Sequence, residues 1–388
     1  MKTVPLSIAA KIIMGQSPPS ETYNKDGRGL PFFQGKADFG EMYPKVRMYC
    51  NAPKKIANEG DILISVRAPV GPTNINSQKS CIGRGLAAIR SENGSDAKYL
   101  LYFLRYYEPK LARLSKGSTF DAIGKDDLAK IPIPLPPLPE QQRIAALLDK
   151  ADRVRRLRRY ARELSDSYLQ AVFLEMFGDP VENPRGWETG KLNDLCEKVV
   201  DCPHETPEVA DGITPYACIR SSDIQNGFLD WSTTRYLSED EYLKRIIREV
   251  PMAGDIFYCR EGARLGNAAR IPEGKTVCLG QRMMMFRAKP GVSTSEFIWG
   301  FLETKSTYQQ AMKIVGGSAS PHINVKDIKA FYTIIPPLPL QEKFACAVQH
   351  YERLRAQQRE AERQAEMLFG SLLALSFAEG LERAFGAS

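Results

Sequence analysis

The sequence has little of what enzymes and membrane proteins commonly carry. It contains only three histidines among 388 residues, and no Ser/His/Asp arrangement suited to nucleophilic catalysis stands out. No apolar run approaches the roughly 20 residues of a membrane-spanning helix, and the N-terminal residues lack the layout of a signal peptide. The eight cysteines are scattered without close pairing, which suits a reducing cytoplasm better than a disulfide framework.

Fragments that resemble catalytic motifs each lack a required feature. The Gly-Lys-Thr at 274–276 would need a glycine at position 269 to form a phosphate-binding loop, and that residue is Ala269. Asp255 and Glu273 have loose nuclease-like spacing, but Pro272 predicts a turn where a metal-binding carboxylate would need a strand. Neither pattern therefore predicts an active site.

Metal-binding and methyl-transfer signatures are absent as well. Cys196, Cys202 and His204 lack a fourth partner at a spacing that suits zinc. The chain has neither an Asn/Asp-Pro-Pro-aromatic loop nor the glycine-rich cofactor strand of an adenine methyltransferase. We predict a chain with no catalytic residues, no metal site and no cofactor of its own.

The composition is that of an ordinary soluble protein with a basic excess. Hydrophobic residues make up 43% and charged residues 26%, and the length allows two or three domains with their own cores. The formal net charge is +7 and the pI about 8.9. A basic chain favours an anionic partner without proving one.

The strongest pattern is an internal duplication. The residues Pro-Pro-Leu-Pro at 136–139 recur at 336–339, an offset of 336 − 136 = 200. Further pairs follow along the chain, namely Gly60-Asp61 with Gly254-Asp255, Cys81 with Cys278, and Gly117-Ser118 with Gly317-Ser318. The offset grows from 194 to 197 to 200 along these pairs, so small insertions separate two copies of one unit.

Each Pro-Pro-Leu-Pro introduces a long charged helix. Proline suits the first helical turn, and no further Pro or Gly occurs until Gly178 in one copy and Gly370 in the other. These tracts predict helices of roughly 30 to 40 residues, or roughly 45 to 60 Å. Apolar residues recur at steps of three and four, which predicts an antiparallel pair of helices joined along a coiled-coil seam. The predicted seam residues are Leu147, Ala151, Val154, Ala161, Tyr168, Val172, Ala347, Tyr351, Leu354, Ala361, Ala365, Leu368 and Leu372. Two unrelated amphipathic helices, each packed on its own domain, are the alternative.

The segments before the helices predict mixed globular domains, with short strands among Gly- and Pro-rich turns and one aromatic-rich helix. The predicted fold class is α+β, with two similar mixed α/β domains separated by two long antiparallel coiled-coil helices in pseudo-two-fold symmetry. A two-fold protein suits duplex DNA, with half-sites about one turn (~34 to 36 Å) apart. The helices would then set the gap between two half-sites.

The junction and the segment before it resemble a known family. The sequences GSTFDAIGKDDLAKIPIPLPPLPEQQRIAALLD and GGSASPHINVKDIKAFYTIIPPLPLQE are similar to those of the DNA-specificity subunit of type I restriction-modification systems. The resemblance covers nearly the whole chain. It implies target-recognition domains at 1–135 and 179–335, and spacer helix regions at 136–178 and 336–388.

The resemblance also implies a role and partners. The chain would be a non-catalytic, cytoplasmic subunit of a bacterial or archaeal complex that recognises a bipartite, asymmetric target in double-stranded DNA. It would bind two methyltransferase subunits through its helices, together with restriction/translocase subunits. S-adenosylmethionine, ATP and Mg would be used by those partners and not by this chain.

Basic and small polar residues in turns and at strand ends are the candidate DNA contacts. They are Arg28, Lys36, Arg47, Lys54, Lys55, Arg67, Arg84, Lys116 and Ser118 in the first half, and Arg220, Arg235, Lys244, Arg245, Arg260, Arg264, Arg282 and Ser318 in the second. Arg67 and Arg260 stand out because each follows the repeated Gly-Asp strand. The alternative for each cation is a solvated surface charge.

Two further alternatives remain open. The helix arginines Arg153, Arg155, Arg156, Arg158, Arg159 and Arg162 would form either a solvated face with ion pairs along the helix or a track for DNA phosphates. A coiled-coil scaffold or adaptor that binds no DNA would explain the helices but not the duplicated domains. Strong salt dependence of DNA binding would distinguish a specificity subunit from such a scaffold.

Overall fold

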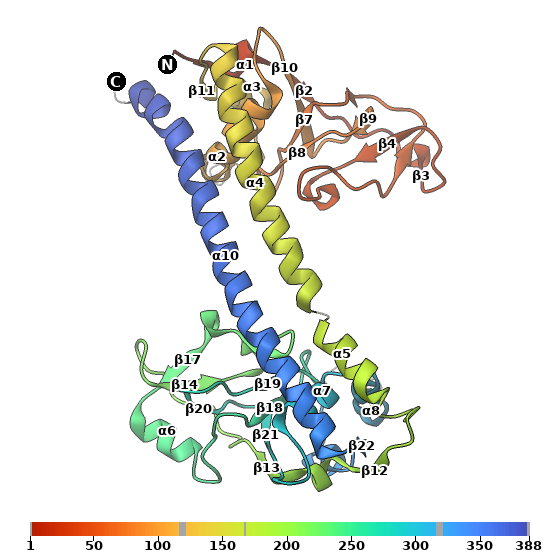
Figure 1. The fold of residues 1–388 in the computed structure, drawn as a ribbon. Coiled ribbons are helices and arrows are strands. Elements are labelled where there is room, and N and C mark those ends of the chain that lie inside the picture. Colours follow the sequence, from red (N-terminus) through yellow and green to blue (C-terminus); the bar gives the residue numbers. More distant parts are fainter. Residues whose placement is uncertain (1, 116–121, 167, 316–320, 386–388) are drawn as a thin grey trace. The chain divides into compact units, whose positions relative to one another are not determined.

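The computed structural model describes residues 2–115, 122–166, 168–315 and 321–385 (Figure 1). The chain divides into two compact units, Met1–Arg159 with Glu360–Ser388, and Tyr160–Arg359. Both combine helices and strands, as the sequence predicted. None of the helices in the described ranges is long and apolar enough to cross a membrane.

The first unit is built around a four-stranded antiparallel sheet in the order β2-β10-β7-β8. A second sheet has the order β3-β5-β4-β9-β6, with β4 and β9 parallel, and β1 pairs with β11. The strands are β1 Thr3–Pro5, β2 Ala10–Met14, β3 Tyr23–Asn24, β4 Leu30–Phe33, β5 Tyr49–Cys50, β6 Ile56–Ala57, β7 Ile62–Ser65, β8 Thr73–Ile75, β9 Ser80–Ile82, β10 Leu86–Ser91 and β11 Pro132–Pro134. The short helices are α1 Leu6–Ala9, α2 Ala97–Ser115 and α3 Lys125–Ala129.

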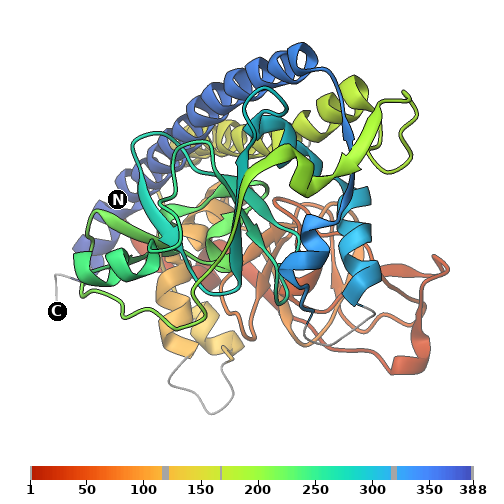
Figure 2. The same ribbon diagram turned by 90° about the horizontal axis from the view of Figure 1, so that it is seen from below.

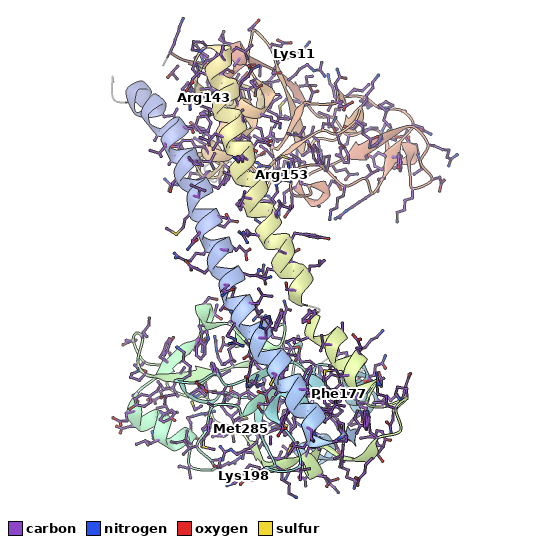
Figure 3. All side chains as sticks on the ribbon, viewed as in Figure 1. Lys11, Arg143, Arg153, Phe177, Lys198 and Met285 are labelled. Atoms are coloured by element: carbon purple, nitrogen blue, oxygen red, sulfur yellow. The ribbon has the colours of Figure 1, made fainter. Side chains whose placement is uncertain are left out.

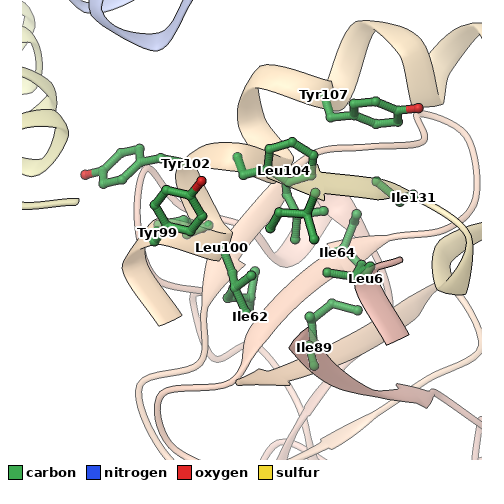
Figure 4. Packing of buried hydrophobic residues seen from close by; sticks show 14 of the residues in the cluster. Leu6, Ile62, Ile64, Ile89, Tyr99, Leu100, Tyr102, Leu104, Tyr107 and Ile131 are labelled. Atoms are coloured by element: carbon green, nitrogen blue, oxygen red, sulfur yellow. The ribbon is translucent and has the colours of Figure 1, made fainter. Parts of the chain in front are cut away.

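The core of the first unit lies between helix α2 and the four-stranded sheet. Tyr99, Leu100 and Leu104 of α2 are fully buried against Ile62 and Ile64 of β7 (Figure 4). Both faces of β7 are covered, because Ile62 and Ile64 belong to this core and Leu63 is fully buried in a second cluster on the opposite face. Burial of the aromatic stripe on α2 confirms the core-facing helix predicted after position 96.

The second unit repeats this plan. Its four-stranded sheet has the order β13-β21-β18-β19, β12 pairs with β22, and β14 runs parallel to β20. The strands are β12 Glu188–Lys191, β13 Cys196–Asp201, β14 Tyr216–Ile219, β15 Ile224–Gln225, β16 Phe228–Leu229, β17 Arg235–Leu237, β18 Ile256–Cys259, β19 Ala268–Arg270, β20 Thr276–Leu279, β21 Met283–Ala288 and β22 Tyr332–Ile335. The short helices are α6 Glu239–Arg245, α7 Ser295–Leu302, α8 Lys305–Val315 and α9 Val325–Lys329.

The second unit differs from the first by the added helix α6, which lies beside the sheet of β17, β14 and β20 (Figures 1 and 2). Its main core contains Phe177 and its second cluster contains Met285, both fully buried, whereas Lys198 lies at the surface (Figure 3). The Gly-Asp repeat has one structural role in both units. Asp61 pairs with Arg90 at 2.8 Å, and Asp255 pairs with Arg287 at 2.8 Å.

A buried glutamine fixes the start of each long helix. The Gln141 Oε1 accepts the backbone N–H of Asp96 at 2.9 Å, and its Nε2 donates to the Pro136 carbonyl at 2.8 Å. The Gln341 side chain makes the same bonds, to the N–H of Thr294 at 3.0 Å and the Pro336 carbonyl at 2.8 Å. The repeated geometry explains why the Pro-Pro-Leu-Pro motif is followed by glutamine at both sites, since only an amide can donate and accept in this way.

Replacing either glutamine by alanine should destabilise its own unit. The change leaves a buried N–H and a carbonyl without partners, at about 1–3 kcal/mol each. Urea unfolding followed by circular dichroism measures the decrease for Gln141→Ala. The exposed neighbour Gln142 provides the control, because Gln142→Ala should stay within about 0.5 kcal/mol. Equal effects of the two substitutions would contradict this role for Gln141.

The helices after the two motifs are α4 Leu138–Asp166, α5 Tyr168–Phe177 and α10 Leu338–Phe385. Gly178 follows α5 with φ +79° and donates its N–H to the Leu174 carbonyl at 2.9 Å, a common helix ending. The predicted length of the second helix is too short. Helix α10 continues through Gly370 for a total of 48 residues, because one glycine costs a helix only about 1 kcal/mol and does not end it by itself.

The predicted seam is partly wrong. Ala151, Tyr351 and Ala365 are buried and Val172, Ala347, Ala361 and Leu372 are half-buried, whereas Leu147, Val154, Ala161, Tyr168, Leu354 and Leu368 are exposed. The helices do run antiparallel in the second unit, where Gln358 donates to the Ser165 hydroxyl at 3.0 Å and Tyr351 stacks on Tyr168. Apolar residues occupy two different sets of heptad positions along these helices, so their spacing alone did not identify which set is buried.

Charged residues occupy many of the buried heptad positions of these helices. In the first unit Asp152 is fully buried and forms ion pairs with Arg105, Arg155 and Arg156 at 3.2, 2.6 and 3.3 Å. Arg155 also pairs with Glu366 of α10 at 3.2 Å and lies 4.5 Å from the centre of the Phe369 ring. The Asp152 carboxylate and the guanidinium groups neutralise one another's charge, so this face of α4 can be buried although its residues are charged.

The apolar end of α10 packs within the first unit. The Phe377 ring lies 5.4 Å from that of Tyr99 and 5.5 Å from that of Phe103, and Phe369 lies 6.0 Å from Tyr102. These aromatic contacts join α10 to α2.

Candidate nucleic-acid interface

Four predicted DNA contacts of the first unit surround one concavity of about 660 Å³. The cations are Lys36, Arg47, Arg67 and Arg84; Ser17, Phe32, Gln34, Asp38 and Met48 also line it. Each cation lies at or beyond the end of a strand, where the side chain is no longer covered by the sheet. The tertiary structure therefore brings together residues spread over nearly 50 positions of sequence.

Close backbone packing shapes this concavity. A Cβ at Gly85 would lie 2.3 Å from the Gln34 carbonyl oxygen, so only glycine fits there. Beside it, the N–H of Arg84 donates to the Ser17 hydroxyl at 3.3 Å. These contacts hold the β9–β10 turn against the segment after β4, and so bring Arg84 near Lys36.

The concavity carries a positive charge. Its single acidic lining residue, Asp38, accepts the backbone N–H of Gln34 at 2.7 Å and of Gly35 at 3.4 Å. None of the four cations forms an ion pair with another residue in the described ranges. Unpaired cations around a hollow favour an anionic ligand, and DNA phosphates are such a ligand.

The other candidates of the first unit lie outside the concavity. Arg28 is exposed and pairs with Asp26 at 3.1 Å, and Lys54 and Lys55 are exposed. Lys116 and Ser118 fall outside the described residues, as does Ser318 of the second unit.

Two candidates of the second unit are wrong as surface contacts, because both are buried. Arg245 is 5% exposed and donates to the carbonyls of Leu279 and Glu205 at 2.8 Å, so it holds loops together. Arg260 is 4% exposed and pairs with Asp201 at 2.9 Å and Glu261 at 3.1 Å. Guanidinium groups engaged in this way have no free face for DNA.

Arg260 lies one position earlier along its strand than Arg67 does, because the offset of 194 that relates Gly60 to Gly254 relates Val66 to Arg260. The N–H of Ile123 donates to the Val66 carbonyl at 3.0 Å, and the N–H of Ile323 donates to the Arg260 carbonyl at 3.1 Å. Arg260 thus corresponds to the buried Val66. A one-residue shift along a strand moves a side chain to the opposite face. The counterpart of Arg67 is Glu261, which faces His322 at 3.1 Å.

The remaining candidates of the second unit are dispersed. Arg220 is half-buried and pairs with Asp223 at 2.9 Å, and Arg264 is exposed and donates to the Ile224 carbonyl at 3.1 Å. Arg235, Lys244 and Arg282 are exposed. No described pocket of this unit gathers them, so the positive concavity belongs to the first unit.

Sequence reasoning missed Gln34, an exposed amide at the rim of the concavity. Its backbone N–H bonds to Asp38 as that of Arg220 bonds to Asp223 at 2.9 Å. Alignment of the two copies at this turn would have revealed the correspondence. Amides and guanidinium groups are both suited to hydrogen bonding with base edges.

Two units of one strand order, each leading through a proline–glutamine junction into a long helix, define a duplicated recognition protein. The chain belongs to the type I restriction modification DNA specificity domain family, whose model matches residues 2–161 and 184–365. It is thus a specificity subunit of the type I restriction-modification class.

Individual relatives agree with this assignment. A Methanocaldococcus jannaschii protein provisionally described as the type I restriction enzyme MjaX specificity subunit is 53% identical over 154 residues, 39% of this chain and 36% of that protein's length. The MjaIX specificity subunit of the same organism is 25% identical over 76% of this chain and 71% of its own length. The S subunit structure from M. genitalium matches 97% of this chain and 96% of its own with a TM-score of 0.59 and 15% identity, a likeness of fold.

Proposed function

We propose that this chain recognises a bipartite, asymmetric target in double-stranded DNA and recruits the subunits that modify and cleave it. Residues 1–135 and 179–335 act as target-recognition domains, and 136–178 and 336–388 are helical spacers in a pseudo-two-fold arrangement. The observation that carries the proposal is the duplication with unlike loops: one strand order, but Arg67 in one unit and Glu261 in the other. Different side chains on one scaffold favour different base sequences.

The chain acts without catalysis of its own. Methylation of adenine would be performed by two methyltransferase subunits using S-adenosylmethionine, and cleavage by restriction/translocase subunits using ATP and Mg. Within the described ranges, no three His, Cys, Asp or Glu side chains are grouped as a metal site would require. The proposal assigns this chain only the recognition and docking steps.

An apolar stripe on the helices supports the docking step. On the first unit's part of α4, Leu147, Val154 and Leu157 are between 41% and 55% exposed. On the second unit's part of α4 and α5, Tyr160, Leu164 and Tyr168 are between 54% and 61% exposed. An exposed apolar stripe at coiled-coil spacing favours a helical partner, and the methyltransferase subunits are the partners we assign to it.

Methylation mapping tests the proposal. The chain is co-expressed with the methyltransferase encoded beside it, and the host DNA is sequenced for modified adenines. We expect one motif with two short specific halves and a fixed gap. Exchange of residues 1–135 for another such domain should change one half only.

Three results would contradict the proposal. A motif without a gap would exclude the helical spacer, and a change in both halves after the exchange would exclude modular recognition. A soluble complex that modifies no DNA would instead favour a protein scaffold.

A further inference from the structure

The second unit contains a pocket of about 490 Å³ that the proposed function does not use. This size is within the range of small-molecule sites. Its walls come from α5, α7, α10 and the turn between β15 and β16. The lining residues are Glu163, Leu169, Gln170, Phe173, Asn226, Gly227, Phe228, Asn267, Trp299, Gly300, Glu303 and Tyr351.

Aromatic side chains form much of the wall. The Phe228 ring lies 5.7 Å from that of Trp299 and 6.1 Å from that of Tyr351. The Trp299 indole N–H donates to the Gly227 carbonyl at 3.0 Å, which fixes the ring. The Arg355 guanidinium already stacks on the Phe228 ring, 3.6 Å from its centre. A flat cation is therefore compatible with this aromatic group.

The carboxyl group of Glu303 lies in the pocket and forms no ion pair with another described residue. The Glu303 Oε1 accepts the Ala268 N–H at 2.8 Å, and Gln170 donates to the Glu303 backbone carbonyl at 2.8 Å. Among the described lining residues, two are acidic and none is basic. Burial raises the pKa of Glu303 to about 7, against the lowering effect of the Ala268 hydrogen bond.

Gly227 packs closely against this carboxyl group and the Trp299 ring. Its φ is +79°, and a Cβ there would lie 2.8 Å from the Trp299 ring and 3.2 Å from Glu303 Oε2. A side chain at this position would therefore crowd both the ring and the carboxyl oxygen.

The carboxyl group is not a requirement of the duplicated fold. The glutamine bonds make Thr294 the counterpart of Asp96, so position 303 corresponds to position 105, nine residues further in each copy. That residue is Arg105 in the first unit, where it pairs with Asp152 at 3.2 Å. At this position the second unit thus has Glu303, which forms no ion pair with another described residue, whereas the first unit has Arg105 in an ion pair.

We propose that this pocket binds a small planar organic cation, an amidinium or guanidinium compound, with its flat group on Trp299 and Phe228 and its charge at Glu303. A bidentate N–H pair would bond to the carboxylate, and the aromatic walls would exclude water. This site is distinct from the positive concavity of the first unit, since its described lining is acidic.

Calorimetric titration of the full chain with benzamidine at pH 8 tests the site, with neutral benzamide as the isosteric comparison. We expect millimolar benzamidine affinity, at least tenfold stronger than for benzamide. Glu303→Gln, which keeps the size of the side chain, should reduce benzamidine affinity at least tenfold. The matched control is Glu108→Gln, since Glu108 is a half-buried acid of the first unit whose pKa is also raised by burial; it should leave the affinity unchanged.

A pH series on the unaltered protein keeps the test valid if Glu303→Gln fails to fold. With a pKa of about 7, the ionised fraction of Glu303 falls about tenfold from pH 8 to pH 6, and benzamidine affinity should fall with it. The other titratable groups around it are Glu163 and Tyr351 in the lining, with Tyr258 and Cys259 behind. Equal binding of benzamide, unchanged binding by a folded Glu303→Gln, or no pH dependence would overturn the proposal.

Discussion

Replacing Asp152 by asparagine should lower the free energy of unfolding by about 3–5 kcal/mol, because it removes the buried charge that three half-buried arginines share. Asp152 is fully buried between Arg105, Arg155 and Arg156. Asparagine keeps the shape but leaves Arg105 and Arg156 without their carboxylate partner, whereas Arg155 keeps Glu366. Urea unfolding measures the decrease, and hydrogen exchange of α4 should show that the helix opens first in the first unit.

The duplicated position in the second unit supplies a control. Glu352 pairs with Arg270 at 3.0 Å, but its side chain is 40% exposed and Arg270 keeps a second partner, Glu296, at 2.7 Å. Glu352→Gln should therefore cost no more than about 1 kcal/mol. If both substitutions destabilise equally, burial of the Asp152 charge does not govern the stability of this region.

The second large effect concerns DNA. Joint replacement of Arg47 and Arg67 by alanine should reduce the slope of log K against log salt by about 1.8, at about 0.9 for each phosphate that the protein no longer neutralises. At 0.1 M salt this corresponds to a roughly 60-fold weaker affinity. Because phosphate contacts carry no sequence information, specific and unrelated duplexes should be affected alike. Fluorescence anisotropy over a salt series, with the chain in the proposed complex with the methyltransferase, gives the slope.

Lys54 and Lys55 provide the matched control. Both are exposed and basic but do not line the concavity. Their joint replacement by alanine removes the same charge and should leave the slope within about 0.5 of the original. If the two double variants weaken binding equally, general charge and not the concavity attracts the DNA.

The sequence predicted the organisation of this protein in useful detail. The repeated Gly-Asp and Pro-Pro-Leu-Pro motifs indicated two units of one fold, because they mark an ion pair and a helix start that the fold requires twice. The burial of Phe369 and Phe377 in the core of the first unit, by contrast, was not specified by these motifs.

Candidate site residues were harder to predict. Lys36, Arg47, Arg67 and Arg84 were named individually, but only folding brings them around one concavity. Arg245 and Arg260 have the same side chain and similar local sequence, yet both are buried. A guanidinium group can bind a carboxylate inside the protein as well as a phosphate outside it, and sequence does not distinguish these partners.

The sequence by itself determined the duplication, the long helices and the family, because these depend on local motifs and on periodicity. Tertiary structure decided which phase of the helices is buried and which arginines are exposed. Both depend on partners distant in sequence: Asp152 makes a charged seam tolerable, and Asp201 pairs with Arg260 inside the second unit. Local patterns record the tendency of a segment, whereas burial and ion pairing are settled only when distant segments meet.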